Sequence, residues 1–248
     1  MTEGRQDATI MVAYLEQKER TDEALLATTA KADRLLNEIE EMVAMNCTAV
    51  DIAYSPNDLY RLKREGKKAI MLGIENGYAI GKDLSRVAHF RKRGVVYMTL
   101  CHNGNNDICG SARYNEENLG VTPFGEQVIQ EMNRLGMMVD LSHSGERTFY
   151  ETLDISSQPV VCSHSSSRAL CDHPRNLTDD QLRAIARKGG VVQVCLYSGF
   201  LRKERPAHIL DAIEHLNHMV NVMGIEHVGI GSDLTVTEVL SDATTLRK

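Results

Sequence analysis

Two histidines, His143 and His164, stand at equivalent places in the stretch 136–165. Each follows a short apolar run, 137–139 or 159–162, and a helix-like segment separates the runs. Such alternation is typical of parallel strands with helical crossovers, in which functional side chains gather at the carboxyl ends of the strands. The pattern therefore places two imidazoles on one rim, and neutral imidazole is a strong ligand of zinc and related ions. One such histidine would more simply cap a strand, but a pair favours a metal site.

Polar side chains also follow other candidate strands. These strand ends carry Glu75, His102, Tyr197 and Asp233. A barrel rim would gather them from distant sequence positions into one site, where a carboxylate and two histidines can bind metal. Two divalent ions about 3.5–4 Å apart can share a hydroxide and stabilise a tetrahedral intermediate. A glutamate suits such a pair because each of its oxygens can bind one ion.

Three of the candidate residues have structural interpretations of comparable weight. Glu75 taken alone would be a helix cap. Asp233 would orient or accept a proton, or contact a substrate amine, but a cap on the following segment explains it nearly as well. Arg175 lies in a predicted loop, where its forked guanidinium would either grip a carboxylate or form a loop-stabilising salt bridge.

The composition is that of an ordinary globular protein. The chain has 248 residues, of which 42% are hydrophobic and 25% charged, which suits one sizeable core and an α/β barrel of one domain. A net charge of −6 argues against nucleic acid and anionic membrane surfaces as partners. Six scattered cysteines without a C-x-x-C pair are read as reduced thiols of a cytoplasmic enzyme. The N-terminus carries no apolar signal core, and no apolar run is long enough to span a membrane.

The apolar runs and helical patterns predict the elements that position these residues. Seven strands are expected, at 8–14, 69–74, 95–100, 137–139, 159–162, 191–197 and 227–230. Helices are expected at 23–45, 57–65, 83–92, 122–135, 145–153, 165–172, 179–188 and 207–223. No internal repeat or linker interrupts this alternation. The sequence therefore predicts a single (β/α) barrel domain over residues 1–248.

Several sequence segments carry a family resemblance. In chain order they read GIENG, TLCHNGNN, GVTPFGEQVIQEMNRLGMMVDLSHS, VVCSHSSSRAL, HPRNLTDDQL, GGVVQV and VGIGSD. They resemble the membrane dipeptidase (renal dipeptidase) family of zinc peptidases, over most of the chain from about residue 4 to residue 233. The resemblance implies a (β/α)8 TIM-type barrel of the metal-dependent hydrolase kind, with a binuclear zinc site. It also implies hydrolysis of dipeptides by a metal-activated hydroxide, and a homodimer, since family members are commonly dimers.

The same resemblance implies metal-binding roles for three residues. Glu75 resembles the carboxylate that bridges the two zinc ions. His143 and His164 resemble the two imidazole ligands of one of them.

It implies substrate-binding and catalytic roles for four others. His102 resembles the histidine that contacts the substrate and the developing oxyanion, and Arg175 the arginine that holds the substrate carboxylate. Asp233 resembles the last-strand acid near the substrate amine, with a catalytic role. Tyr197 is a weaker match to a tyrosine of the substrate pocket.

The sequence departs from the family pattern at both ends. The family's first strand ends in a His-x-Asp pair that ligates the other zinc, but this chain has no histidine before His89, and 8–14 resembles the family's second strand. A GSDFDG-like continuation reads GSDLTV, and the final helices are missing. We therefore expect seven barrel strands without the family's first one, and facing free edges at 8–14 and 227–230. We expect the N-terminal residues or a partner chain to narrow or fill the gap, and at most one tightly held zinc.

Two other functions fit the same residues. The first is a non-catalytic dipeptidase-like protein that binds a ligand without turnover, which the missing His-x-Asp pair favours. The second is another metal-dependent barrel amidohydrolase, acting on a cyclic amide or lactone. An arginine that grips a carboxylate discriminates between substrates, because it requires a free C-terminus.

Overall fold

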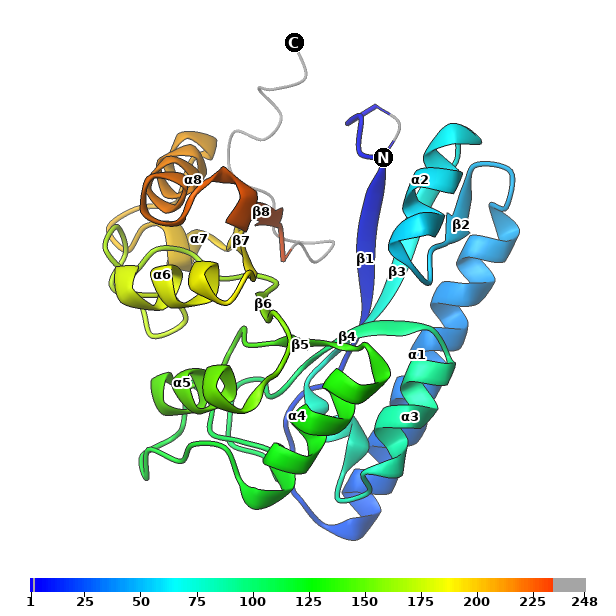
Figure 1. Cartoon of the computed structure of the whole chain (residues 1–248), viewed down its shortest axis with the longest axis horizontal. Coiled ribbons are helices and arrows are strands. Elements are labelled where there is room, and N and C mark those ends of the chain that lie inside the picture. The colour runs from blue at the N-terminus through cyan, green and yellow to red at the C-terminus, as the bar shows by residue number, and fades with distance from the viewer. Residues whose placement is uncertain (2, 234–248) are drawn as a thin grey trace.

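The computed structural model of the chain describes residues 1 and 3–233, and its centre is a curled sheet of parallel strands (Figure 1). The strands are β1 (Ala8–Tyr14), β2 (Val50–Ile52), β3 (Lys68–Glu75), β4 (Val95–Thr99), β5 (Met138–Asp140), β6 (Val161–Cys162), β7 (Val191–Cys195) and β8 (Val228–Gly231). The helices are α1 (Asp22–Met45), α2 (Pro56–Arg64), α3 (Ser85–Lys92), α4 (Pro123–Leu135), α5 (Glu146–Ile155), α6 (Asp179–Arg187), α7 (Ser198–Leu201) and α8 (Ile209–Met223). Two 3-10 turns, η1 (Gly77–Ile80) and η2 (Ile225–His227), complete them.

The strands pair in the order β1-β3-β4-β5-β6-β7-β8, and every pair is parallel. The short strand β2 pairs with the first residues of β3, and β4 pairs with β3 from Leu72 onward. Because all strands run in the same direction, their carboxyl ends lie at one end of the sheet. The predicted α/β class and parallel barrel-type sheet are confirmed.

The sheet does not close on itself. Among the described residues, β1 pairs only with β3 and β8 only with β7, so each keeps one free edge (Figure 1). A cavity of about 1530 Å³ reaches from the strand ends to this opening, and Ile10 of β1 and Ile230 of β8 line it. Residues of the N-terminus line the same cavity, namely Met1, Gly4 and Gln6. The structure is therefore an open barrel, as the sequence led us to expect.

A main hydrophobic core joins the sheet to its helices, and a smaller cluster of Ala53, Leu62 and Ala69 packs α2 against β3. Both faces of the central strands are buried, which explains the nearly continuous apolar sequence of β3, KAIMLGIE. Helix α1 begins after Thr21, whose hydroxyl accepts a hydrogen bond from the Ala24 N–H, and its buried stripe is Leu25, Ala32, Leu36, Ile39 and Val43. Burying a side chain such as Leu36 contributes about 1.5–3 kcal/mol. The rigid strands can thus hold side chains in fixed places at their ends.

Three local predictions differ from the structure. Strand β2 was not expected, and the last predicted barrel strand before α7 ends at Cys195 rather than at residue 197. The predicted helix 165–172 is absent, because its backbone bonds to a later segment: the Arg168 N–H donates to the Leu177 carbonyl, and the Leu177 N–H donates to the Ser166 carbonyl. These long-range bonds replace the helical ones.

Two further expectations from the sequence concern the final helices of the family's barrel and the absence of a membrane-spanning segment. The expectation that the family's final helices are missing concerns the chain after residue 233, which lies outside the described residues. Within the part of the chain that the structure describes, no helix combines the length and apolar character that crossing a membrane requires.

Candidate metal centre and active site

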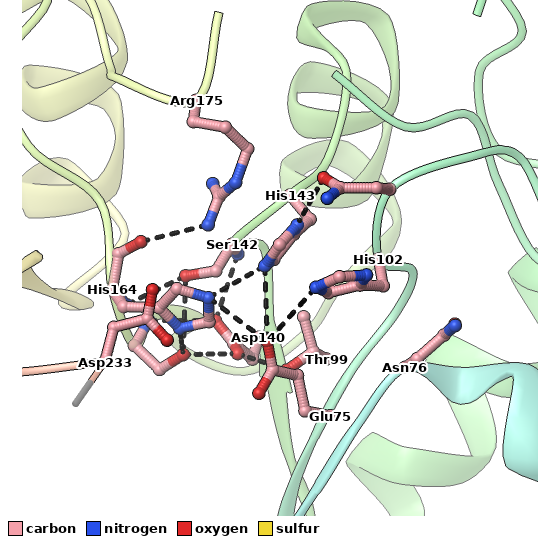
Figure 2. Close-up of polar contacts among 12 residues, drawn as sticks. Glu75, Asn76, Thr99, His102, Asp140, Ser142, His143, His164, Arg175 and Asp233 are labelled. Carbon is pink, nitrogen blue, oxygen red and sulfur yellow. Dashed lines mark hydrogen bonds and ion pairs between the residues drawn. The ribbon is translucent and has the colours of Figure 1, made fainter. Parts of the chain in front are cut away.

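Glu75, His143 and His164 meet at the carboxyl end of the sheet (Figure 2). Glu75 is the last residue of β3, and the two histidines follow β5 and β6. The Nε2 atoms of His143 and His164 lie 3.3 and 3.4 Å from the same oxygen, Oε1 of Glu75, and 2.9 Å from each other. Within residues 1 and 3–233, this is the one group of three or more His, Cys, Asp or Glu side chains that could hold a metal ion. Two imidazoles and a carboxylate are a donor set that suits zinc and related divalent ions.

His102 faces the same carboxylate from the loop after β4 (Figure 2). Its Nε2 atom lies 3.7 Å from Glu75 Oε1, and its ring centroid lies 4.1 Å from that of His143. On its other side it meets the exposed ring of Tyr14, the last residue of β1. Three imidazoles therefore surround one carboxylate oxygen.

Arg175 reaches this region from a loop and is only 3% exposed. One Nη donates to the backbone carbonyl of His164 at 3.2 Å, and the guanidinium carbon lies 5.4 Å from the centroid of the Phe200 ring. Its Nε has no hydrogen-bond partner among the described residues, although it is buried. A buried cation with an unused donor is positioned to bind an anion.

Asp233 and Tyr197 also line the cavity, after the ends of β8 and β7. Asp233 follows β8, and its Oδ2 accepts a hydrogen bond from the Cys195 thiol at 3.4 Å. Tyr197 precedes α7, packs edge-on against Phe200 and is 42% exposed. Six of the seven residues predicted from the sequence line the cavity of about 1530 Å³, namely Glu75, His102, His143, His164, Tyr197 and Asp233. Arg175 lies buried beside them.

Burial dominates the electrostatics of the site. It raises the pKa of Glu75 to about 8, with help from the charges of Asp233 and Asp140 and against the opposing effect of Arg175. Burial also lowers the pKa of His102 to about 4 and that of His164 to about 3, and Arg175 adds to both shifts. The pKa of His143 is held well below its usual range for the same reasons. The imidazoles are therefore neutral at pH 7, the form that ligates metal ions.

Asp140 is a supporting residue that the sequence reasoning did not select. This last residue of β5 is fully buried, and its Oδ1 accepts the N–H groups of Ser142 and Ser163 at 3.0 and 2.9 Å. Its Oδ2 accepts the hydroxyls of Thr99 and Ser163, both at 2.6 Å. The carboxylate thus ties together the ends of β4, β5 and β6. A repeated Ser-His dipeptide after β5 and β6 was the available sign of this arrangement.

Uncommon backbone conformations also concentrate here. His143, Asp233 and Asn76 have φ angles of 71°, 54° and 89°, in the left-handed region that most side chains avoid. The His143 carbonyl accepts the Ala112 N–H at 2.7 Å, which helps to hold its conformation. Such conformations persist only where the surrounding structure imposes them, and they cluster at functional sites.

Comparison with known proteins agrees with this geometry. The family model described as membrane dipeptidase (peptidase family M19) matches residues 1–248. The chain is 43% identical over 176 residues to an uncharacterized dipeptidase of Schizosaccharomyces pombe, a match that covers 69% of this chain and 42% of that protein. It is 30% identical over 239 residues to a dipeptidase of Claviceps purpurea, covering 94% of this chain and 56% of the relative.

A solved structure gives the same result at the level of the fold. The probable dipeptidase PvdM from Pseudomonas aeruginosa superposes with a TM-score of 0.88 at 25% identity, over 95% of this chain and 76% of that one. The chain spans about half the length of the curated relatives it matches. Because the family model matches it from end to end, the chain belongs to the membrane dipeptidase family, peptidase family M19.

Proposed function

We propose that this chain is a zinc-dependent dipeptidase whose metal ion is held by Glu75, His143 and His164. The spacing of the three ligand atoms carries the proposal. Around a tetrahedral zinc with ligand distances of about 2.0–2.1 Å, neighbouring ligand atoms stand about 3.3–3.4 Å apart. The separations of Glu75 Oε1 from the two Nε2 atoms, 3.3 and 3.4 Å, have this size, and the Nε2–Nε2 distance of 2.9 Å is somewhat shorter.

The residues around the metal ligands supply the remaining chemistry of the proposal. A bound zinc ion would contribute Lewis acidity, by polarising a carbonyl and lowering the pKa of a water molecule to about 7. Neutral His102, 3.7 Å from Glu75, donates an N–H to the substrate oxygen that gains negative charge. Asp233 binds the substrate amine and takes up or returns a proton at its carboxylate.

Two charged side chains of the site favour a dipeptide as substrate. Arg175, buried beside the cavity, offers its unused Nε donor to a free C-terminal carboxylate. Asp233, in the cavity wall, offers a carboxylate to a free N-terminal amine. Tyr197, which also lines the cavity, borders the substrate side chains. A cyclic amide or a lactone carries neither terminal charge, so this pair of residues speaks against the amidohydrolase alternative.

One observation favours a second candidate, a non-catalytic dipeptide-binding protein. The family resemblance implies a second zinc ligated by a His-x-Asp pair, whereas the described residues contain one group of three metal-ligating side chains. Within the described residues we therefore propose one zinc, held by these three side chains. Three protein ligands still leave the open position that a catalytic zinc requires.

The test combines metal content with turnover. Elemental analysis of the purified chain should give about one zinc per chain, and an unblocked dipeptide such as Ala-Ala should be hydrolysed. His164→Ala should lose both the zinc and the hydrolysis, whereas His218→Ala, on α8 beside Asp179, should keep both. If the wild-type chain bound zinc but hydrolysed no dipeptide, the second candidate, a non-catalytic dipeptide-binding protein, would be favoured. If the wild-type chain bound no zinc, the proposed metal site would be rejected.

Three related predictions accompany this function. We propose that residues 1–248 form one incomplete barrel domain, which is supported by a core that runs without interruption from Ala13 of β1 to Met223 of α8. The homodimer and the cytoplasmic location stay predictions from the sequence.

A further inference from the structure

His164 is joined to the buried carboxylate of Asp140 through a single hydroxyl group (Figure 2). Ser163 Oγ lies 2.6 Å from Asp140 Oδ2 and 2.7 Å from His164 Nδ1. The exposed fractions of Asp140, Ser163 and His164 are 0%, 8% and 6%. Within the protein, the Nδ1 side of the imidazole therefore meets this hydroxyl, while its Nε2 side faces Glu75 and His143.

The direction of these hydrogen bonds follows from the number of available protons. An ionised carboxylate only accepts, and four donors converge on Asp140: two backbone N–H groups and the hydroxyls of Thr99 and Ser163. Ser163 has one hydroxyl proton, and giving it to Asp140 leaves only lone pairs toward His164. His164 Nδ1 must then carry a hydrogen and donate it to Ser163.

This arrangement determines what His164 presents to the metal site. A neutral imidazole has one N–H, so a hydrogen on Nδ1 leaves Nε2 with a free lone pair. We propose that Asp140 and Ser163 are positioning residues that fix His164 as the Nδ1–H tautomer and so aim an unprotonated Nε2 at the metal ion. The metal part of this inference rests on the proposed function, whereas the tautomer does not.

The opposite tautomer would obstruct metal binding in a specific way. With its hydrogen on Nε2, His164 could donate to His143 Nε2 across their 2.9 Å separation, and the two ligands would satisfy each other. In the proposed tautomer His164 has no hydrogen on Nε2 to donate, and the bond would require His143 as its donor. His143 is oriented in a similar manner, since its Nδ1 lies 3.3 Å from Asn103 Oδ1. Both lone pairs and the Glu75 oxygen then converge on one point, which a cation satisfies.

Four variants separate this role from ordinary packing. Asp140→Asn replaces an acceptor by a group that can donate to Ser163, so Ser163 can turn its proton to His164 Nδ1 and favour the Nε2–H tautomer. Ser163→Ala removes the connection, and Ser163→Thr restores a hydroxyl. Thr99→Val is the matched control, because it removes a donor to the same Asp140 oxygen but leaves the path through Ser163 intact.

The first measurement reads the tautomer in metal-free protein. Nitrogen-15 NMR of the full chain with labelled histidine, assigned with His164→Ala, should show the one-bond N–H coupling on Nδ1 of His164 in the wild type and in Thr99→Val. In Asp140→Asn the proton should move wholly or partly to Nε2. A wild-type His164 with its proton on Nε2 would overturn the proposal, whatever zinc does.

The second measurement is zinc affinity by competition with a chelator. Asp140→Asn and Ser163→Ala should bind zinc 10–100-fold more weakly, the usual effect of losing such a partner, whereas Ser163→Thr and Thr99→Val should stay within about threefold of the wild type. If Asp140→Asn does not fold, as judged by circular dichroism, the Ser163 pair decides the question. Equal affinity in Ser163→Ala and wild type would refute the positioning role. An Nδ1–H tautomer in a chain that binds no zinc would instead reject the proposed function and leave the tautomer assignment standing.

Discussion

Gly231 of β8 passes so close to Ser163 that a Cβ atom at residue 231 would lie 1.7 Å from the Ser163 carbonyl oxygen. Only glycine permits this approach, which brings the end of β8 against the residue that precedes His164. Gly231→Ala should therefore displace one of the two backbones and lower the free energy of unfolding by about 3 kcal/mol. Urea unfolding of the metal-free chain measures this change.

Gly229 in the same strand is the matched control. A Cβ there first meets the Gln193 side chain, at 3.1 Å, and that side chain can move aside. Gly229→Ala should cost less than about 1 kcal/mol. Similar losses in both variants would show that the contact with Ser163 does not limit the position of β8.

Arg175 should set the requirement for a free C-terminus. Arg175→Met keeps an unbranched buried side chain but removes the charge, so kcat/KM for an unblocked dipeptide should fall about 100-fold or more. The same dipeptide with a C-terminal amide lacks the carboxylate, and its low kcat/KM should change only a few-fold. Steady-state kinetics on both substrates provide the check, and an equal loss on both would mean that Arg175 supports the fold rather than the substrate.

Glu75 should matter more to the metal than to the fold. Glu75→Gln keeps the shape of a side chain that is 8% exposed but removes the charge that favours a cation, so zinc affinity should fall at least tenfold. In the metal-free protein at pH 7, burial keeps most of the Glu75 carboxyl protonated, since it raises the pKa of that group to about 8, so the neutral amide should leave stability there nearly unchanged.

Thermal melts with and without a chelator separate these two effects. At a zinc concentration of 100 times Kd, bound metal adds about 2.7 kcal/mol to the stability of the folded chain. The wild type should lose this increment when the chelator is added, and Glu75→Gln should show little change. If the chelator left the melting temperature of the wild type unchanged, the proposed metal site would be contradicted.

Asp211 should make the stability of the chain depend on acidic pH. Its side chain is 3% exposed; burial alone would raise its pKa, but hydrogen bonds from Arg205, from the His208 N–H and from Arg202 outweigh burial and hold the pKa well below the usual value of about 3.9. A lowered carboxyl pKa stabilises the fold above the unfolded value and loses this effect as the pH falls below it.

Asp211→Asn should therefore cost about 3 kcal/mol at pH 7 and distinctly less at pH 3. Urea unfolding at the two pH values gives the difference. Asp172→Asn is the control, because the Asp172 side chain is exposed, and it should change the free energy of unfolding little at either pH. A cost for Asp211→Asn that is the same at both pH values would argue against the ion-pair explanation.

The sequence predicted the seven main strands because a strand buried on both faces must be apolar along its whole length. β2 escaped detection since Val50–Ile52 is only three residues long, contains an aspartate and pairs with just the start of β3. The segment 165–172 was wrongly expected to be helical, because no local pattern reveals that its backbone bonds to residues near Leu177.

The position of the candidate site followed from strand ends, whereas its hydrogen bonding did not. Parallel topology alone places Glu75, His143 and His164 at one end of the sheet, and the structure brings their ligand atoms within 4.8 Å of one another. The part of Asp140 depends on which face of β5 it occupies and on its distance from Ser163, and neither quantity can be read from residue order. The roles assigned to the site residues stay predictions.

The strand order also determines how the molecule can grow during synthesis. Each strand from β4 to β8 pairs with the strand that immediately precedes it in the chain, so a nascent chain can add one βα unit at a time to an existing edge. Glu75, His143 and His164 all belong to the part of the sheet that is complete once β6 has joined. Arg175 and Asp233 emerge only afterwards. The metal-binding residues can thus come together on the ribosome before Arg175 and Asp233, which are proposed to bind the two ends of the substrate, have been synthesised.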